Sequence, residues 1–145
     1  MARKYQIILT DRHEYEDDKA DSTTILYGEM DYDSHERYVI RYAEESGDYQ
    51  GMVTEVSVSG NTQVTISRLN PVNNAPQLEL SVELERRHTC QYDTPYGLMM
   101  MGVYGKEMDS RMSAFGGTLE FKYDIDIDGN YVSTNTLHIT VKEIF

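Results

Sequence analysis

Residues 118–142, which read TLEFKYDIDIDGNYVSTNTLHITVK, decide the fold. From Thr118 onward, apolar and polar side chains alternate without a break. The apolar set occupies odd positions (Leu119, Phe121, Tyr123, Ile125 and Ile127), and a charged set occupies the even positions (Glu120, Lys122, Asp124, Asp126 and Asp128). This period of two is typical of a β-strand with one buried face and one solvated face.

A second strand follows a turn at Asp128-Gly129-Asn130, and its apolar residues Leu137, Ile139 and Val141 are also at odd positions. Residues that pair directly across a hairpin share a face, so the two numbers of each pair must sum to an even value. This condition predicts a loop of odd length, with three residues and with Gly129 or Asn130 in the left-handed conformation. The sequence leaves the frame of this loop open.

The same pattern extends upstream. Val56 and Val58 share parity with Val64 and Ile66 across Ser59-Gly60-Asn61, which predicts another hairpin with an odd loop. Leu78, Leu80 and Val82 alternate with polar residues before a turn near residues 85–87. Shorter strands are expected at Tyr5–Thr10, Thr24–Tyr32, Arg37–Tyr42, His88–Asp93, Leu98–Tyr104 and Asp109–Ser113. The acidic stretch Asp11–Ser22 lacks an apolar stripe and is expected to be a solvated loop.

No segment has a useful helical period, and turn signals recur about every 8–12 residues. We therefore predict an all-β fold: one antiparallel β-barrel of about 8–10 strands that forms a single domain over residues 1–145. A barrel is favoured because closure removes the exposed strand edges that a meander of hairpins would otherwise leave.

Composition narrows the function. The formal net charge is −12, from 25 acidic and 13 basic residues, which disfavours nucleic acid and anionic membrane surfaces as partners. The single cysteine, Cys90, excludes an internal disulfide and fits a reducing compartment. No apolar run has the length of a secretion signal or a membrane span. A cytoplasmic protein is expected.

Several segments, taken in order, resemble the YwiB-like family of uncharacterised bacterial proteins. They are residues 42–45 (YAEE), 64–68 (VTISR), 88–89 (HT), 94–97 (TPYG) and 116–123 (GGTLEFKY), and together they span nearly the whole chain. The resemblance implies a calycin-like, or lipocalin-like, β-barrel and a bacterial source. It carries over no catalytic residues. The chain has no tryptophan for the lipocalin Gly-x-Trp signature.

Two short motifs resemble metal sites. Residues 124–129 (DIDIDG) match the opening of a calcium loop, but its twelfth position is Asn135 instead of the bidentate glutamate, so an acidic strand end is the better interpretation. His88 and Cys90 lie on one strand face, yet structural zinc needs four ligands. A packed thiol is expected, and no metal or other cofactor is predicted.

Arg68 is the strongest candidate for a ligand anchor. It continues the parity of Val64 and Ile66, so its side chain should point to the apolar side, where an acidic partner is needed. An internal carboxylate is favoured over a ligand as that partner. Tyr92, Tyr96 and Tyr104 are expected to line the same space. In the methionine-rich run 98–101, Met99 and Met101 should share one face and Met100 the other.

Two functions fit these features. The first is the binding of a small, largely apolar or anionic-headed molecule in the barrel interior or mouth. The second is a filled-core interaction domain whose acidic surface docks a protein partner. No phosphate loop, nucleophile elbow or paired-carboxylate site is visible, so an enzyme is the least favoured class. Ligand binding is slightly preferred.

Overall fold

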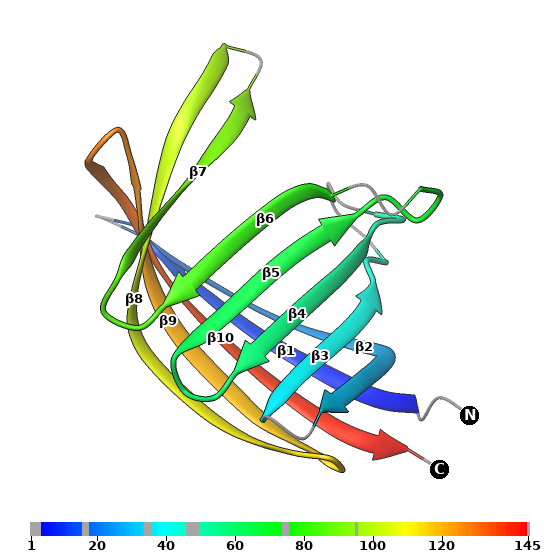
Figure 1. Ribbon diagram of the computed structural model, residues 1–145. Coiled ribbons are helices and arrows are strands. Elements are labelled where there is room, and N and C mark those ends of the chain that lie inside the picture. Colours follow the sequence, from blue (N-terminus) through cyan, green and yellow to red (C-terminus); the bar gives the residue numbers. More distant parts are fainter. Residues whose placement is uncertain are drawn as a thin grey trace.

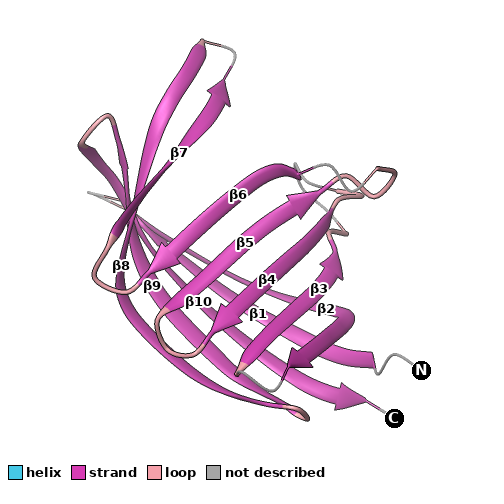
Figure 2. Cartoon of the chain, viewed as in Figure 1, coloured by secondary structure: helices cyan, strands magenta, loops and turns pink. Residues whose placement is uncertain are grey.

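The structure, a computed structural model, describes residues 4–15, 18–33, 36–45, 50–73, 76–94 and 96–144, without the side chains of residues 76–78 and 91–94. These residues form strands and turns and contain no helix (Figure 2). The strands are β1 (Lys4–Glu14), β2 (Lys19–Asp33), β3 (Arg37–Ala43), β4 (Val53–Ser59), β5 (Gln63–Leu69), β6 (Pro76–Glu83), β7 (Arg87–Thr94), β8 (Gly97–Ser113), β9 (Gly116–Ile127) and β10 (Asn130–Ile144). Within the described ranges there is thus no helix long and apolar enough to cross a membrane.

The strands form one antiparallel sheet with the order β6-β5-β4-β3-β2-β1-β10-β9-β8-β7. Each strand pairs with its neighbours in the chain, except that β6 and β7 form the two edges of the sheet, and β1 also pairs with β10. The sheet curls into a nearly closed barrel, which stays open between β6 and β7 (Figure 1). The predicted all-β antiparallel barrel is therefore confirmed, with ten strands in the described part of the chain.

The hairpin between β9 and β10 corrects one prediction. Ile127 pairs with Asn130, so the loop has two residues, Asp128 and Gly129, with φ of 52° and 86°. A β-bulge between Tyr131 and Ser133 then adds one residue to β10, and beyond it the paired numbers sum to an even value. The bulge, instead of a three-residue loop, brings both apolar faces to the interior.

The hairpin between β4 and β5 follows the prediction. Val58 pairs with Val64 and Ser59 with Gln63, which leaves a three-residue loop. Gly60 opens this loop with φ of 55°, in the left-handed region that glycine adopts at low cost. Both strands therefore keep their apolar faces inward without a bulge.

Asp11–Ser22 is not the predicted loop. β1 continues to Glu14 and β2 begins at Lys19, and Arg12 pairs with Asp21 both in register and as an ion pair of 2.9 Å. β10 pairs with the other edge of the same segment, up to Glu14. Backbone hydrogen bonds on both sides of β1 thus extend the strand where no apolar stripe marks it.

Residues 98–104 and 109–113 belong to one strand, β8, instead of the two strands predicted. A register shift between Gly105 and Glu107 places one extra residue, Lys106, in the ladder with β9. The backbone of Gly105 also bonds to the preceding turn, since its carbonyl accepts from the Glu85 amide at 2.8 Å. The irregularity therefore bends a continuous strand without ending it.

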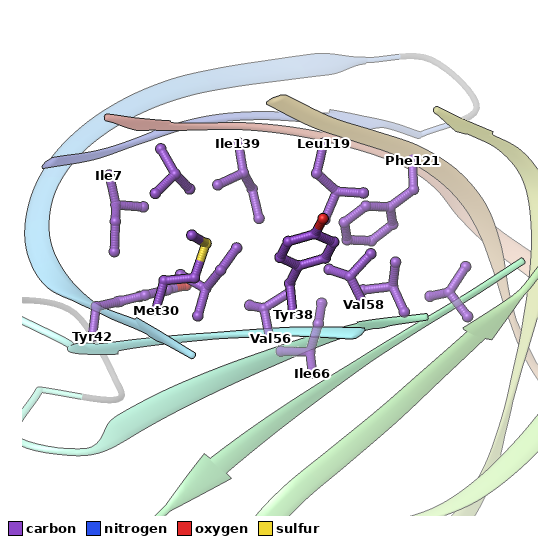
Figure 3. Close-up of a cluster of buried hydrophobic side chains, with 14 of the residues drawn as sticks. Ile7, Met30, Tyr38, Tyr42, Val56, Val58, Ile66, Leu119, Phe121 and Ile139 are labelled. Atoms are coloured by element: carbon purple, nitrogen blue, oxygen red, sulfur yellow. The ribbon is translucent and has the colours of Figure 1, made fainter. Parts of the chain in front are cut away.

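The interior next to this bend is filled by apolar side chains from both walls of the barrel. Tyr38 points from β3 toward Leu119 and Phe121 on the opposite wall (Figure 3). Its hydroxyl donates to the carbonyl of Met112 at 3.1 Å, and the hydroxyl of Tyr5 donates to the carbonyl of Ala114 at 3.2 Å. These tyrosines fill the core and satisfy backbone carbonyls at the far end of β8.

Removing the buried ring of Phe121, which is fully inaccessible, should leave a cavity in this core. We expect Phe121→Ala to lower the free energy of unfolding by about 3–5 kcal/mol in denaturant titration. Phe115, which is 69% exposed, supplies the control, and Phe115→Ala should change stability by less than about 0.5 kcal/mol. Equal losses in the two variants would contradict this placement of the core.

Candidate functional site

The barrel holds a cavity of about 610 Å³ beside its filled core. Its wall includes the core residues Val56, Ile66 and Leu80, so the cavity begins where the packed interior ends. Side chains from every strand except β7 line it, as far as side chains are described. They are Leu9, Asp11, His13, Ser22, Thr24, Leu26, Tyr42, Glu44, Glu45, Val56, Ile66, Arg68, Leu80, Met101, Tyr123, Ile125 and Leu137.

The cavity changes from apolar to polar along individual strands. On the inner face of β1, Ile7 is buried in the core, Leu9 lines the cavity, and Asp11 and His13 follow at the same parity. Leu26, Thr24 and Ser22 of β2 repeat this order. The alternation of a strand therefore produces an apolar floor and a polar rim within one continuous face.

Arg68 lies at this transition and faces an internal acid, as predicted. Its Nε is 3.8 Å from Oε1 of Glu44, and the two side chains are only 23% and 19% exposed. The same Glu44 oxygen accepts a hydrogen bond of 2.8 Å from the hydroxyl of Thr54, which is fully buried and pairs with Arg68 in the β4–β5 ladder. Neighbouring strands thus hold a charged pair and a hydroxyl together at the cavity wall.

Two tyrosines complete this polar cluster. Burial, with a smaller effect of Asp11, raises the pKa of Tyr123 to about 12, and the positive charge of Arg68 opposes the rise. Burial and Glu44 raise the pKa of Tyr42 well above its usual range, again against Arg68. Both phenols are therefore neutral at physiological pH, and they present hydroxyl groups near the Arg68 charge.

A second polar group lies at the rim. Nε2 of His13 is 3.1 Å from Oδ2 of Asp11, and its Nδ1 makes a short contact with Oδ1 of Asn135. Asn135 is buried and donates in turn to the hydroxyl of Ser133 at 3.1 Å. This chain joins the polar end of β1 to the inner face of β10.

The structure separates the residues that the sequence grouped with Arg68. Tyr96 is 99% exposed and Tyr104 is 39% exposed, and neither lines the cavity. Tyr96 lies between β7 and β8, at the tip of a hairpin that stands away from the barrel (Figure 1), whereas Tyr104 pairs with the outward Arg87 and follows the buried Val103, on the outer face of β8. The side chain of Tyr92 lies outside the described residues.

Several cavity residues were missed. Asp11 and His13 continue the odd parity of Ile7 and Leu9, a signal that the assignment of residues 11–22 to a loop concealed. Glu44 follows β3 at the parity of the buried Tyr42 and had no apolar neighbour to mark it. The methionine prediction holds: Met99 and Met101 are partly buried, while Met100, on the other face, is exposed.

The two metal-like motifs engage other partners. Asp126 forms a bidentate pair with Arg87, at 2.9 and 2.6 Å, whose hydrogen bonds lower the pKa of the Asp126 carboxyl. His88 contacts Glu83 at 2.8 Å, and burial raises the pKa of the Cys90 thiol. Among the residues that the structure describes, no group of three or more acidic, histidine or cysteine side chains is placed to hold a metal ion.

Comparisons with known proteins give the fold a context. The model of a family described as a domain of unknown function, DUF1934, matches residues 7–139. The crystal structure of the YwiB protein from Bacillus subtilis superposes with a TM-score of 0.70 at 14% sequence identity, over 95% of this chain and 91% of that one. A comparison with curated protein sequences gives no match.

The buried phenols should titrate late. The fold favours neutral Tyr123, so its stabilising effect is complete below the ordinary tyrosine pKa of about 10 and is lost as pH rises through about 12. In an alkaline absorbance titration, we expect a delayed fraction of tyrosine ionisation that coincides with unfolding, because burial raises the pKa of Tyr38, Tyr42 and Tyr123. Tyr123→Phe should remove part of this delayed amplitude.

Proposed function

Because the chain belongs to the DUF1934 family, whose description assigns no activity, we propose a function from its cavity: the protein binds a small, largely apolar molecule inside the barrel. The observation that carries this proposal is the cavity of about 610 Å³, within the range of about 300–1,000 Å³ usual for small-molecule sites. Eight of its 17 described lining side chains are apolar and form its floor, and two tyrosines and seven polar or charged side chains form the rest of the wall.

Arg68 is the proposed anchor for a polar or anionic head group. Its guanidinium is mostly buried and is the only lysine or arginine side chain among the described residues that line the cavity. A ligand carboxylate or phosphate bound to Arg68 would leave Glu44 with a partner, because Glu44 also accepts a hydrogen bond from Thr54. An apolar tail would then contact Val56, Ile66 and Leu80.

A filled-core interaction domain is the weaker alternative, because side chains fill only part of the interior. The net charge of −12 supports a site for a small molecule and not for nucleic acid or an anionic membrane surface. The free thiol of Cys90 supports a cytoplasmic setting.

Filling the cavity should abolish binding. Leu9 lines the cavity, and Leu9→Trp should reduce the affinity for a fluorescent apolar probe by at least 10-fold, measured by fluorescence titration of delipidated protein. The control is Ile25→Trp, on a strand residue that is 54% exposed, and it should bind as the original chain does. Equal binding by both variants would contradict a ligand site in the cavity. Native mass spectrometry of freshly purified protein should show a bound small molecule that Leu9→Trp lacks.

A test of Arg68 requires a variant that leaves no uncompensated charge. Removing Arg68 alone leaves the charge of Glu44 uncompensated and can lower the free energy of unfolding by up to about 3–5 kcal/mol. The double variant Arg68→Met/Glu44→Gln removes both charges. We expect it to bind a long-chain alcohol as the original does and the corresponding carboxylate at least 10-fold more weakly, by calorimetry.

Arg111→Met is the control for this experiment, since Arg111 is 78% exposed on its side chain. It should leave both affinities unchanged. A double variant that loses alcohol and carboxylate equally, or neither, would remove Arg68 from the proposed site.

A further inference from the structure

β6 and β7 follow one another in the chain, yet they do not form a ladder. A two-residue turn, Leu84-Glu85, joins them, and a single bridge pairs Glu83 with Arg86. Beyond that bridge the two strands diverge, and β7 pairs with β8 (Figure 1). We call this interval between β6 and β7, from residues 79–83 to residues 87–90, the seam.

The seam is open because the turn between β6 and β7 places an inward residue of one strand opposite an outward residue of the other. Leu80 and Val82 of β6 point inward, and so does Cys90 of β7, which packs against the core. A ladder between these faces must pair residues whose numbers sum to an even value. The bridge between Glu83 and Arg86 fixes an odd sum, so extending it would pair inward Val82 with Arg87, which faces outward.

The hairpin between β9 and β10 has the same conflict and resolves it by a bulge at Val132. The bulge that β6 does contain, at Gln77, lies in its ladder with β5 and not beside the turn to β7, and the ladder of β7 with β8 is regular. Arg87 is instead held outward by its bidentate pair with Asp126, which crosses over Gly102 of the intervening strand β8. The turn itself is fixed by the hydrogen bond from the Glu85 amide to Gly105. These contacts keep β7 from slipping by one residue.

One edge of the seam carries unused backbone groups of β6. The Leu84 amide donates to the Thr62 carbonyl, and the pairs of Val82 with Val64 and Leu80 with Ile66 continue this ladder. Successive residues of a strand direct their backbone N–H and C=O groups to opposite edges. The even residues of β6 bond β5, so the amides of Glu79 and Ser81 point to the other edge, into the seam.

The seam adjoins the cavity. Leu80 and Met101, which line the cavity, come from β6 and β8, the strands on either side of β7, and no described β7 side chain contributes to the wall there. A groove of about 200 Å³ runs along the seam and is lined by Glu79, Ser81, His88, Thr89, Cys90 and Val103. Most of this groove is polar, with Cys90 and Val103 as its apolar members, and Leu80, which lies between Glu79 and Ser81 in β6, lines the cavity itself.

We propose that the seam is the lateral entrance of the cavity and that the ligand is an unbranched apolar chain. This inference rests on the proposed function. A slot between two strand edges admits a flexible chain edgewise, whereas a rigid polycyclic molecule of the same volume is too wide. The parity conflict keeps this slot open without any moving lid, so the entrance is encoded by the length of the turn after Glu83.

One inserted residue tests this directly. A glycine inserted after Glu85 can lie opposite Glu83 and keep the two-residue turn Leu84-Glu85. β7 is then shifted by one residue, so that outward Arg87 pairs with outward Ser81 and His88 pairs with inward Leu80, and β6 and β7 can form a ladder. We expect the Glu79 and Ser81 amides to exchange at least 10-fold more slowly, by hydrogen exchange followed by NMR. Association and dissociation of a fluorescent long-chain carboxylate should both slow at least 10-fold by stopped flow, with Kd within about twofold. The control is Glu85→Gly, which places a glycine in the turn without adding a residue and so does not shift β7.

Blocking the seam chemically gives a second test that does not depend on folding of the insertion. Ser81→Cys in a Cys90→Ser background is labelled with a bulky maleimide, with Ser59→Cys labelled in the same way as the control. Labelling at residue 81 should slow both rates at least 10-fold, and labelling at residue 59 should leave them unchanged.

Unchanged rates in the labelled residue-81 variant, or in an insertion variant that gains protection, would overturn the entrance. In the original chain, a Ser81 amide as protected as that of Val82 would overturn the open seam. If the original chain binds neither chain-like nor polycyclic probes, the proposed function fails, and the hydrogen exchange of Ser81 still decides whether the seam is open.

Discussion

A barrel strand has one face toward the interior, and this requirement governs each ladder of the protein. Because side chains alternate between the two faces of a strand, neighbouring strands must pair inward residues with inward residues. The length of each connecting loop, or a bulge beside it, determines whether they do. The three-residue loop after Ser59 does so directly. The two-residue turn at Asp128-Gly129 does so with a bulge one residue into β10. The turn after Glu83 does neither, and there the barrel stays open.

Tyrosine suits the interior that results. Tyr5 and Tyr38 lie in the filled part of the barrel, and their hydroxyls donate to the carbonyls of Ala114, just after β8, and of Met112, bonds that a phenylalanine could not make. Tyr42 and Tyr123 carry the same chemistry to the cavity wall, where their hydroxyls lie near Arg68. One residue type therefore closes the core at one side and supplies polar groups at the other.

The features that follow from the alternation of apolar and polar residues could be predicted from the sequence, and the features that do not follow from it were missed. Strict alternation identified β9, β10 and the odd loop after Ser59, and parity placed Arg68 on the inner face opposite an internal acid. It could not foresee the bulge at Val132, since a bulge changes parity without a residue signature of its own. The extension of β1 through Asp11 and His13 was missed because the inward residues at the rim of the cavity are polar and so do not form an apolar stripe. Tyr96 lies outside the cavity because alternation does not show where a hairpin leaves the barrel, and Tyr104 does so because it is on the outer face of β8, opposite to that of Met101 and Val103.

Local pairing of charges reconciles a net charge of −12 with an apolar cavity. Glu44 faces Arg68 and accepts from Thr54, and Asp11 contacts His13, so two of the three acids at the cavity already have partners there. The third, Glu45, is exposed to solvent. Water screens an exposed charge strongly, whereas a buried uncompensated carboxylate would repel an anionic head and disfavour an apolar tail. With His13 neutral, the three carboxylates and Arg68 give the described cavity lining a formal charge of −2, so most of the net charge of −12 lies outside the cavity.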